Sequence, residues 1–253
     1  MPELPEVETI VRELGPRLRG RHIVSVEVLQ PRITRHSAVD ITTALPGRRI
    51  HDVRRHGKFI VVDLDSGCLT IHLGMTGQLL FGSTPGPYTR VILTLDDGSL
   101  LYDDTRMFGA IEMGTARVDR LGPDALTELP PEALKRKAHI KAVLLNQNVF
   151  SGIGNIYADE ALFRAGIKPT ARNISKPRAQ KLLAAVDEVL REAIEHRGSS
   201  VSDYVDTEGR RGSFQQRHRV YARENLPCVV CGTPIRKIVV AGRGTHFCPK
   251  CQR

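Results

Sequence analysis

The chain has 253 residues and carries 37 lysines and arginines against 28 acidic residues, which gives a net charge of +9. No apolar run approaches the roughly 18 residues that a membrane span needs, and the start, MPELPEVETI, lacks the basic and apolar regions of a secretory signal. These features exclude a membrane protein and predict a cytoplasmic protein with a polyanionic partner, because each phosphate contact gains free energy by releasing counterions.

The positive charge gathers near the C-terminus. Residues 210–253 contain ten lysines and arginines and a single acidic residue, Glu224. We expect this part of the chain to contribute to a nucleic-acid surface. The alternative is a solvated basic face that has no partner.

The first predicted helix starts at Pro5, because proline suits a first helical turn, and Gly15-Pro16 is expected to end it. After it the apolar pattern changes to period two or to short apolar runs separated by Asp- and Gly-rich turns, which indicates an antiparallel β unit that ends near residue 118. The expected strands are 23–29, 59–64, 69–73, 91–95 and 100–102.

From about Gly122 the periodicity becomes helical. One apolar face lies near residues 140–144, the Gly-rich stretch 151–154 interrupts it, and a helix over 156–165 follows. A longer helix is expected between Ser175, which can cap it, and Gly198, which can end it. Residues 198–226 are polar and rich in Gly, Arg and Ser, so they predict a long loop of the kind that is usually functional.

Four cysteines near the C-terminus have the spacing of a zinc site. Cys228 and Cys231 form one C-x2-C pair, Cys248 and Cys251 form another, and sixteen residues separate the pairs. We predict one structural zinc ion, which would replace a core that some forty residues cannot build. The alternative, two disulfides, is disfavoured in a reducing cytoplasm.

Between the two cysteine pairs, the stretch from Ala241 to Thr245 resembles a hairpin tip that presents Arg243. A guanidinium held there could bind a phosphate through two parallel hydrogen bonds. The alternative is an ordinary solvated arginine in a turn.

The amino terminus can supply a nucleophile. Met1 before a small residue is normally removed, which would expose the secondary amine of Pro2. An α-amino group titrates near 7.7–8.0, and amines attack carbonyl-like carbons to form Schiff bases. Glu3 and Glu6 would lie beside it, where a carboxylate can move protons. Taken alone, these three residues are more simply the capped start of a helix.

Motifs along the whole chain resemble those of the formamidopyrimidine-DNA glycosylase family, Fpg/MutM, within the wider Fpg/Nei group. They occur in family order from the first residue to the zinc finger, so a chance match is remote. The matching segments are MPELPEVE at the start, Arg55-His56-Gly57-Lys58, His72-Leu73-Gly74-Met75-Thr76-Gly77, Asp104-Thr105-Arg106-Met107-Phe108-Gly109, and Gln147 with the segment from Gly152 to Glu160.

The resemblance implies catalytic roles for four residues. Pro2 would attack C1′ of the damaged nucleotide and form a covalent imine, and Glu3 would assist as acid and base. Lys58, otherwise an ordinary hairpin lysine, would donate the proton associated with β-elimination. Arg243 would bind the phosphate at the lesion and help the second, δ-elimination.

The resemblance also implies a set of DNA contacts. Met75, Arg106 and Phe108 would fill the gap left by a flipped base, with Arg106 addressing the unpaired partner base and Phe108 wedging the stack. Without the family, Met75 and Phe108 would be assigned to the core. Asn155 would hold phosphate at a helix start. The weaker candidates for DNA contact are Glu6, Tyr88 and Arg136.

The stretch from Val201 through Phe214 resembles the loop that covers the flipped base in this family, which favours oxidised purines, namely 8-oxoguanine and formamidopyrimidines. The implied activity is a bifunctional glycosylase and abasic-site lyase of base excision repair that acts on damaged double-stranded DNA as a monomer, without a nucleotide cofactor. Two alternatives are an endonuclease VIII-like enzyme for oxidised pyrimidines, whose usual start is P-E-G-P-E, and a DNA-binding relative without catalysis.

We therefore predict an α+β multidomain protein: an N-terminal β-sandwich with a leading helix, a helical helix-two-turn-helix domain, and a C-terminal β-hairpin zinc finger. The expected boundaries are 1–118, 119–214 and 215–253.

Overall fold

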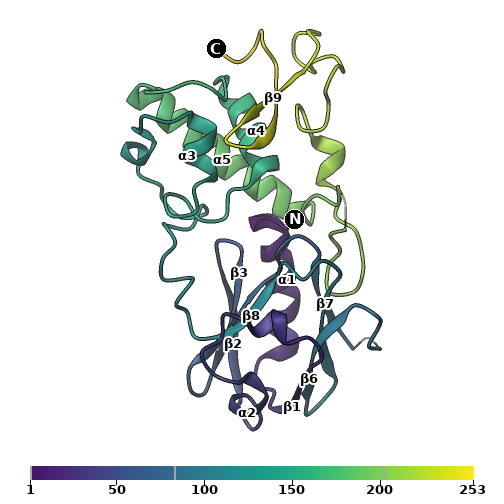
Figure 1. Ribbon diagram of the computed structural model, residues 1–253. Helices are drawn as coiled ribbons and strands as arrows, with labels where there is room; N and C mark the ends of the chain where they lie inside the picture. Colours follow the sequence, from purple (N-terminus) through teal and green to yellow (C-terminus); the bar gives the residue numbers. More distant parts are fainter. Residues whose placement is uncertain (1, 83, 202) are drawn as a thin grey trace. The chain divides into compact units, whose positions relative to one another are not determined.

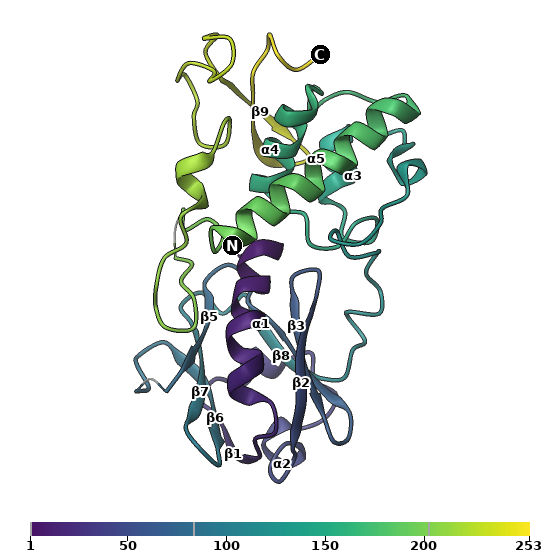
Figure 2. The same ribbon diagram turned by 180° about the vertical axis from the view of Figure 1, so that it is seen from behind.

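The computed structural model describes residues 2–82, 84–201 and 203–253 (Figures 1 and 2). Contacts between residues divide the chain into two compact units. The first unit joins Met1–Arg120 to His196–Ser213, and the second joins Leu121–Glu195 to Phe214–Arg253. Part of the predicted long loop therefore packs with the N-terminal part of the chain. The three-domain boundaries stay a prediction.

The leading helix of the first unit, α1 (Leu4–Leu18), begins and ends differently from its prediction. Glu3 is its N-cap residue, and Pro5 lies in the first turn, where its missing N–H costs nothing. The predicted end at Gly15-Pro16 is wrong, because the helix continues through Pro16 to Leu18. Leu18 is almost fully buried in the core, and this packing outweighs the one helical hydrogen bond that Pro16 cannot donate.

Two four-stranded antiparallel sheets follow α1 in the first unit. Their facing apolar residues and one side of α1 form a single hydrophobic core, so the predicted β-sandwich with a leading helix is confirmed. One sheet has the order β1 (Ile23–Val28), β6 (Thr89–Leu95), β7 (Ser99–Asp104) and β5 (Gly77–Phe81). The other has the order β2 (Ile50–His56), β3 (Phe59–Leu64), β4 (Cys68–His72) and β8 (Ala110–Met113). The short elements η1 (Pro31–Thr34) and α2 (Ile41–Ala44) lie between β1 and β2.

Strands β2, β5 and β8 were not expected from the sequence pattern. In β2 only Ile50 and Val53 are buried, and the other residues are polar or charged, so the strand lacks a clear apolar alternation. It forms because it pairs along its length with β3, from Ile50 opposite Leu64 to His56 opposite Phe59. Pairing with β3 therefore decides the structure of this segment, although its own sequence favours a strand only weakly.

The second unit contains the helices and the C-terminal hairpin. Its elements are η2 (Pro131–Leu134), α3 (Ile140–Leu145), α4 (Asn155–Ala165), α5 (Lys176–Glu195), η3 (Phe214–Arg217), β9 (Arg236–Val240) and β10 (Arg243–Phe247). The helix predicted to end at Gly198 ends instead at Glu195, because Arg197 already has a left-handed φ of 60°. In the part of the chain that the structure describes, no helix has the length and apolarity to cross a membrane.

Candidate functional site

Pro2 lies at the start of α1, next in sequence to a pair of buried carboxylates. Pro2 itself is buried and lies directly outside the helix. Glu3 and Glu6 form a capping box, in which the Glu3 N–H donates to Glu6 Oε2 at 2.7 Å. Their exposed fractions are only 3% and 1%. The Glu6 carboxylate organises the end of the helix, and its contact with DNA stays a prediction.

Glu6 also joins α1 to the segment that follows α5. The Ser199 N–H donates to Glu6 Oε1 at 2.7 Å, and the Tyr204 hydroxyl lies 3.5 Å from the Glu6 carbonyl oxygen. Gly198 has a φ of 77°, and a Cβ there would come within 2.5 Å of Glu6 Oε1. Only glycine fits this position without displacing the carboxylate.

Lys58 lies in the two-residue turn between β2 and β3 and is largely buried. Arg55 fixes this turn to α1, because its guanidinium donates to the Gly57 carbonyl at 3.1 Å and to Glu8 at 2.8 Å. Burial of Glu8 acts to raise the pKa of its carboxyl, but the hydrogen bonds from Arg55 and Arg12 outweigh it, so the pKa lies below its usual value. The same helix thus supports both the Pro2 terminus and the Lys58 turn.

Two loops of the first unit present the residues predicted to enter DNA. Met75 and Phe108 are 37% and 46% exposed, which excludes the alternative that they belong to the core. The Arg106 guanidinium lies 4.7 Å from the centre of the Phe108 ring, a cation–π arrangement. Gly74 allows the loops to pack closely, since a Cβ there would lie 2.5 Å from the Phe108 carbonyl carbon.

The buried side chain of Asp104 binds both of these loops. Its carboxylate is fully buried and accepts hydrogen bonds from the Thr76 hydroxyl at 2.6 Å, the Arg106 N–H at 3.2 Å and the Gly109 N–H at 2.9 Å. Asp104 is the first residue of the D-x-R-x-F-G motif, but no role was predicted for it. A buried aspartate that opens an exposed loop was the signal that could have found it.

His72, at the end of β4, supports the first of these loops, because its Nδ1 accepts the Gly74 N–H at 3.2 Å. Burial, followed by the positive charges of Arg117 and Lys58, lowers the pKa of His72 from 6.5 to about 3. In the unfolded chain His72 binds a proton below pH 6.5, whereas the folded protein excludes it. Stability is therefore complete above pH 6.5 and falls as the pH drops from 6.5 toward 3, by at most about 1.4 kcal/mol per pH unit from this residue.

Urea unfolding at pH 7.5 and pH 5.0 tests this linkage. A His72→Asn variant is the matched control, because asparagine Oδ1 can accept the Gly74 N–H in place of Nδ1 but does not titrate. We expect the variant to lose less stability than the wild type between the two pH values. Equal losses would show that His72 is not linked to folding.

The remaining surface candidates, Tyr88 and Arg136, are both exposed. Tyr88 lies just before β6, and Arg136 follows η2. The structure gives neither residue a surrounding site, and their contacts with DNA stay predictions.

The C-terminal hairpin presents Arg243 as expected. Strands β9 and β10 pair with Val240 opposite Arg243, and Ala241-Gly242 forms the two-residue turn with left-handed φ values of 51° and 70°. Such a turn matches the twist of the two strands. Arg243 is exposed at this turn, in the position from which it could reach a phosphate.

A buried polar network fixes β10 to the helices of the second unit. Lys141 of α3 and Asp159 of α4 form a fully buried ion pair at 2.6 Å. Lys141 Nζ also donates to the Thr245 hydroxyl at 2.8 Å, and Asp159 accepts the His246 N–H at 2.8 Å. Asn155, the first residue of α4, donates from Nδ2 to the Gly244 carbonyl at 2.9 Å. Asn155 is thus placed beside the hairpin that carries Arg243.

The four cysteines converge at the other end of this hairpin. All four sulfur atoms lie within 4.8 Å of one another, with Cys228–Cys251 at 3.9 Å and Cys231–Cys248 at 3.5 Å. A tetrahedron of Zn–S bonds of about 2.3 Å has edges of roughly 3.8 Å, so the donor set fits one zinc ion. None of the four is in a disulfide. Four thiolates leave no position for a reacting water, and the role of the zinc is structural.

Removing the zinc is expected to unfold the hairpin region, because only a few apolar side chains are buried there with the cysteines. A Cys231→Ser variant should retain less than one zinc per chain by elemental analysis and lose amide protection in residues 225–253. Cys68→Ser is the matched control, because Cys68 lies in β4 away from the cluster. Full zinc content and unchanged protection in Cys231→Ser would contradict the four-thiolate site.

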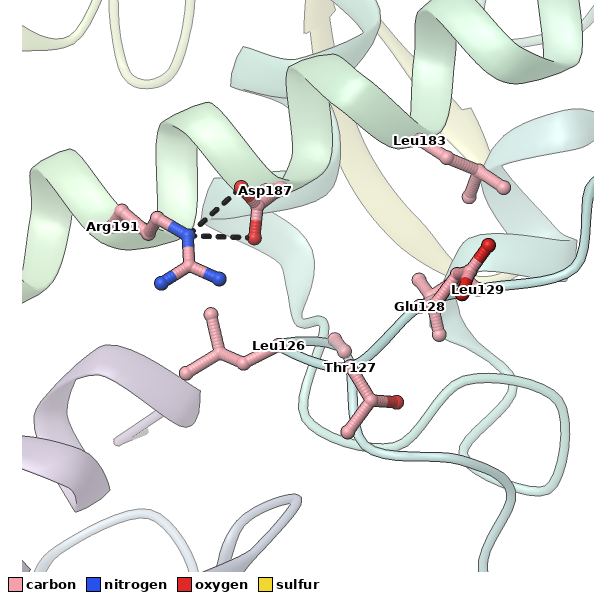
Figure 3. Close-up of a pocket in the computed structure, with 8 residues that line it drawn as sticks. Leu126, Thr127, Glu128, Leu129, Leu183, Asp187 and Arg191 are labelled. Carbon is pink, nitrogen blue, oxygen red and sulfur yellow. Dashed lines mark hydrogen bonds and ion pairs between the residues drawn. The ribbon is translucent and has the colours of Figure 1, made fainter.

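A pocket in the second unit is lined by none of the residues described above. It is formed by residues 125–129 and by Leu183, Asp187 and Arg191 of α5. Figure 3 shows that Asp187 and Arg191 bind each other across one turn of α5, with both distances to Arg191 Nε at 2.8 Å. The charges of these two side chains are therefore mutually satisfied.

Three family models match consecutive parts of the chain. Formamidopyrimidine-DNA glycosylase N-terminal domain matches residues 1–111, Formamidopyrimidine-DNA glycosylase H2TH domain matches residues 121–205, and Zinc finger found in FPG and IleRS matches residues 225–253. These matches confirm the predicted sequence of N-terminal, helix-two-turn-helix and zinc-finger parts, and with it the structural zinc.

Relatives named formamidopyrimidine-DNA glycosylase match over the whole chain. The protein from Solibacter usitatus is 52% identical over 264 residues, covering 100% of both chains. A protein from Thermus thermophilus is 46% identical over 271 residues, covering 100% of this chain and 98% of its own.

Solved structures agree. The crystal structure of MutM (Fpg) from Thermus thermophilus has a TM-score of 0.89 at 43% identity, covering 99% of this chain and 98% of that one. Lactococcus lactis Fpg in complex with DNA containing an abasic site has a TM-score of 0.90 at 34% identity, with both chains covered fully. The chain therefore belongs to the formamidopyrimidine-DNA glycosylase family.

Proposed function

We propose that this protein is a bifunctional glycosylase and abasic-site lyase of base excision repair that removes oxidised purines from double-stranded DNA and nicks the strand. The observation that carries the proposal is the position of Pro2, directly before α1 and next to the buried capping box of Glu3 and Glu6. The removal of Met1, on which the reactive amine depends, concerns a residue outside the described part of the chain.

In the proposed reaction, the nitrogen of Pro2 attacks C1′, the damaged base leaves, and a Schiff base links the protein to the sugar. Glu3 moves protons to and from the sugar ring. Lys58 donates the proton associated with β-elimination, which breaks the strand on the 3′ side. Arg243 binds the lesion phosphate and assists δ-elimination on the 5′ side.

The duplex is held open by side chains of the first unit. Phe108 and Met75 fill the gap in the base stack, and Arg106 addresses the unpaired base. Their exposure on adjoining loops supports these roles, because side chains that enter a base stack must be accessible before DNA binds. Asn155 binds phosphate near Arg243. The zinc ion stabilises the hairpin that carries Arg243.

We propose damaged duplex DNA as the substrate, by analogy with one relative. The Lactococcus lactis structures hold an abasic site in one case and, in a mutant of that protein, a Fapy-dG lesion in another. The enzyme acts as a monomer and without a nucleotide cofactor. Light scattering of the purified protein, with and without a short duplex, checks the monomer.

Borohydride trapping tests the proposed function. The protein is incubated with duplexes that contain 8-oxoguanine or thymine glycol, and borohydride reduces any Schiff base to a stable crosslink. We expect faster cleavage and stronger crosslinking with 8-oxoguanine. Preference for thymine glycol would indicate the endonuclease VIII-like alternative. Tight binding without cleavage or crosslinking of either duplex would indicate a DNA-binding relative without catalysis.

A further inference from the structure

The segment between α5 and η3 is pinned to α1 by a cluster of two carboxylates and two guanidinium groups. Glu13 of α1 and Asp206 of the segment are the carboxylates, and both bind Arg197. Arg210 bonds to Asp206 at 2.9 Å and to Glu13 at 3.3 Å. We refer to Glu13, Arg197, Asp206 and Arg210 as the latch.

The latch is a partly buried network of ion pairs and hydrogen bonds, unlike an isolated ion pair on the surface. The side chain of Asp206 is 1% exposed, and its Oδ1 also accepts the Arg210 N–H at 2.9 Å. Glu13 Oε2 accepts both the N–H and the hydroxyl of Thr207, at 3.1 Å and 2.7 Å. Such convergence of donors on one buried and one partly buried carboxylate fixes a geometry that isolated surface ion pairs do not.

The segment is also closed upon itself. The Ser213 N–H donates to the His196 carbonyl at 2.9 Å, which ties the two ends together. The Gly212 N–H donates to the Ser200 hydroxyl at 2.9 Å, and that hydroxyl donates to the Tyr204 carbonyl at 2.8 Å. These bonds hold the two ends of the segment together, and the latch fixes this piece to α1.

A chain of hydrogen bonds leads from this piece to the proposed nucleophile. The Ser199 N–H binds Glu6 Oε1, and Glu6 Oε2 binds the N–H of Glu3, the residue next to Pro2; both bonds measure 2.7 Å. A shift of the segment would pull on Glu6 and release the backbone of Glu3. The latch can thus control the position of the terminal amine although Glu13 lies about three turns away along α1.

We propose that Glu13 and Asp206 are positioning residues, which act through the segment and Glu6 to hold Pro2 for attack on a nucleotide that still carries its base. This inference rests on the proposed function. Expelling a base from C1′ demands close alignment of the nucleophile and the leaving group. An abasic site already offers an aldehyde, with which an amine condenses by losing water, and no base has to leave. Loosening the latch should therefore slow base removal more than cleavage at an abasic site.

The test compares Glu13→Gln and the milder Arg210→Gln with the wild type in single-turnover assays. One duplex carries 8-oxoguanine and the other a preformed abasic site. We expect base release to slow by about tenfold or more in Glu13→Gln, while abasic-site cleavage changes by less than about threefold. Asp52→Asn, which breaks an exposed ion pair with Arg19 in the same unit, is the matched control and should alter neither rate.

Hydrogen exchange measured by mass spectrometry supplies a second readout that needs no activity. Peptides covering residues 196–213 should exchange faster in both latch variants, while those covering β3 stay unchanged. Unchanged exchange in residues 196–213 would overturn the latch itself. Faster exchange with equal losses on the two duplexes would overturn its positioning role. Failure of the proposed function is distinct, because the wild-type protein would then form no crosslink with borohydride.

Discussion

Replacing Pro2 with glycine is expected to slow turnover on damaged DNA by about 100-fold or more, while the protein stays folded. The proline ring fixes the nitrogen relative to its own Cα and makes it a secondary amine. Glycine leaves a primary amine that can rotate away, and small misplacements of a reacting group cost rates of this order. Single-turnover cleavage of an 8-oxoguanine duplex gives the rate, and thermal unfolding checks the fold.

Pro5→Ala is the matched control, since Pro5 is buried in the first turn of the same helix but is not terminal. It should retain activity within a few-fold. The intact mass of the native protein must also lack the initial methionine, because a retained Met1 would block the amine. Full activity in Pro2→Gly would contradict a special role for the proline ring.

Replacing Lys141 with methionine is expected to lower the free energy of unfolding by about 3–5 kcal/mol. The side chains of Lys141 and Asp159 have no exposed surface, so the substitution would leave the Asp159 carboxylate buried beside an apolar side chain. The β10 strand would also lose the bond from Lys141 to Thr245. Urea unfolding at pH 7.5, in the presence of zinc, measures the change.

Two further variants sharpen this result. Lys141→Met combined with Asp159→Asn should recover more than half of the loss, because the amide is neutral and its oxygen can still accept the His246 N–H. Lys176→Met removes a lysine whose ion pair with Glu132 is exposed, and it should cost less than about 0.5 kcal/mol. If Lys141→Met and Lys176→Met cost the same, the buried pair does not stabilise the protein.

The fold was predictable where local pattern and tertiary packing agree. Strand β3 spans the predicted 59–64, and the helix over 156–165 starts only one residue earlier than expected. The pattern failed at β2, whose charged residues are tolerated because pairing with β3 supplies its hydrogen bonds. It failed again at Pro16, where buried Leu18 keeps the helix going. Both outcomes depend on packing and pairing in the folded chain, which the local sequence does not show.

The candidate site was predictable only as a set of motifs. Pro2 and the four cysteines could be named as candidates from the chemistry of their own atoms, and Lys58 from the resemblance of its motif to the family. The groups that hold them could not be named. Asp104, Glu13 and Asp206 look like ordinary acidic residues in the sequence, and they become organising groups only when the folded chain brings several donors onto each carboxylate. Burial, which decides their role, is a property of the folded chain.

The first unit is formed by two separate segments of the chain, Met1–Arg120 and His196–Ser213. A fragment cut after Arg120 would consequently lack the polypeptide that satisfies Glu6 and Glu13, and two acids on α1 would face solvent or unmatched apolar surface. A fragment meant to fold as the first unit must therefore contain more of the chain than the β-sandwich strands and α1 alone. Any split-protein or truncation strategy has to carry both stretches of the chain.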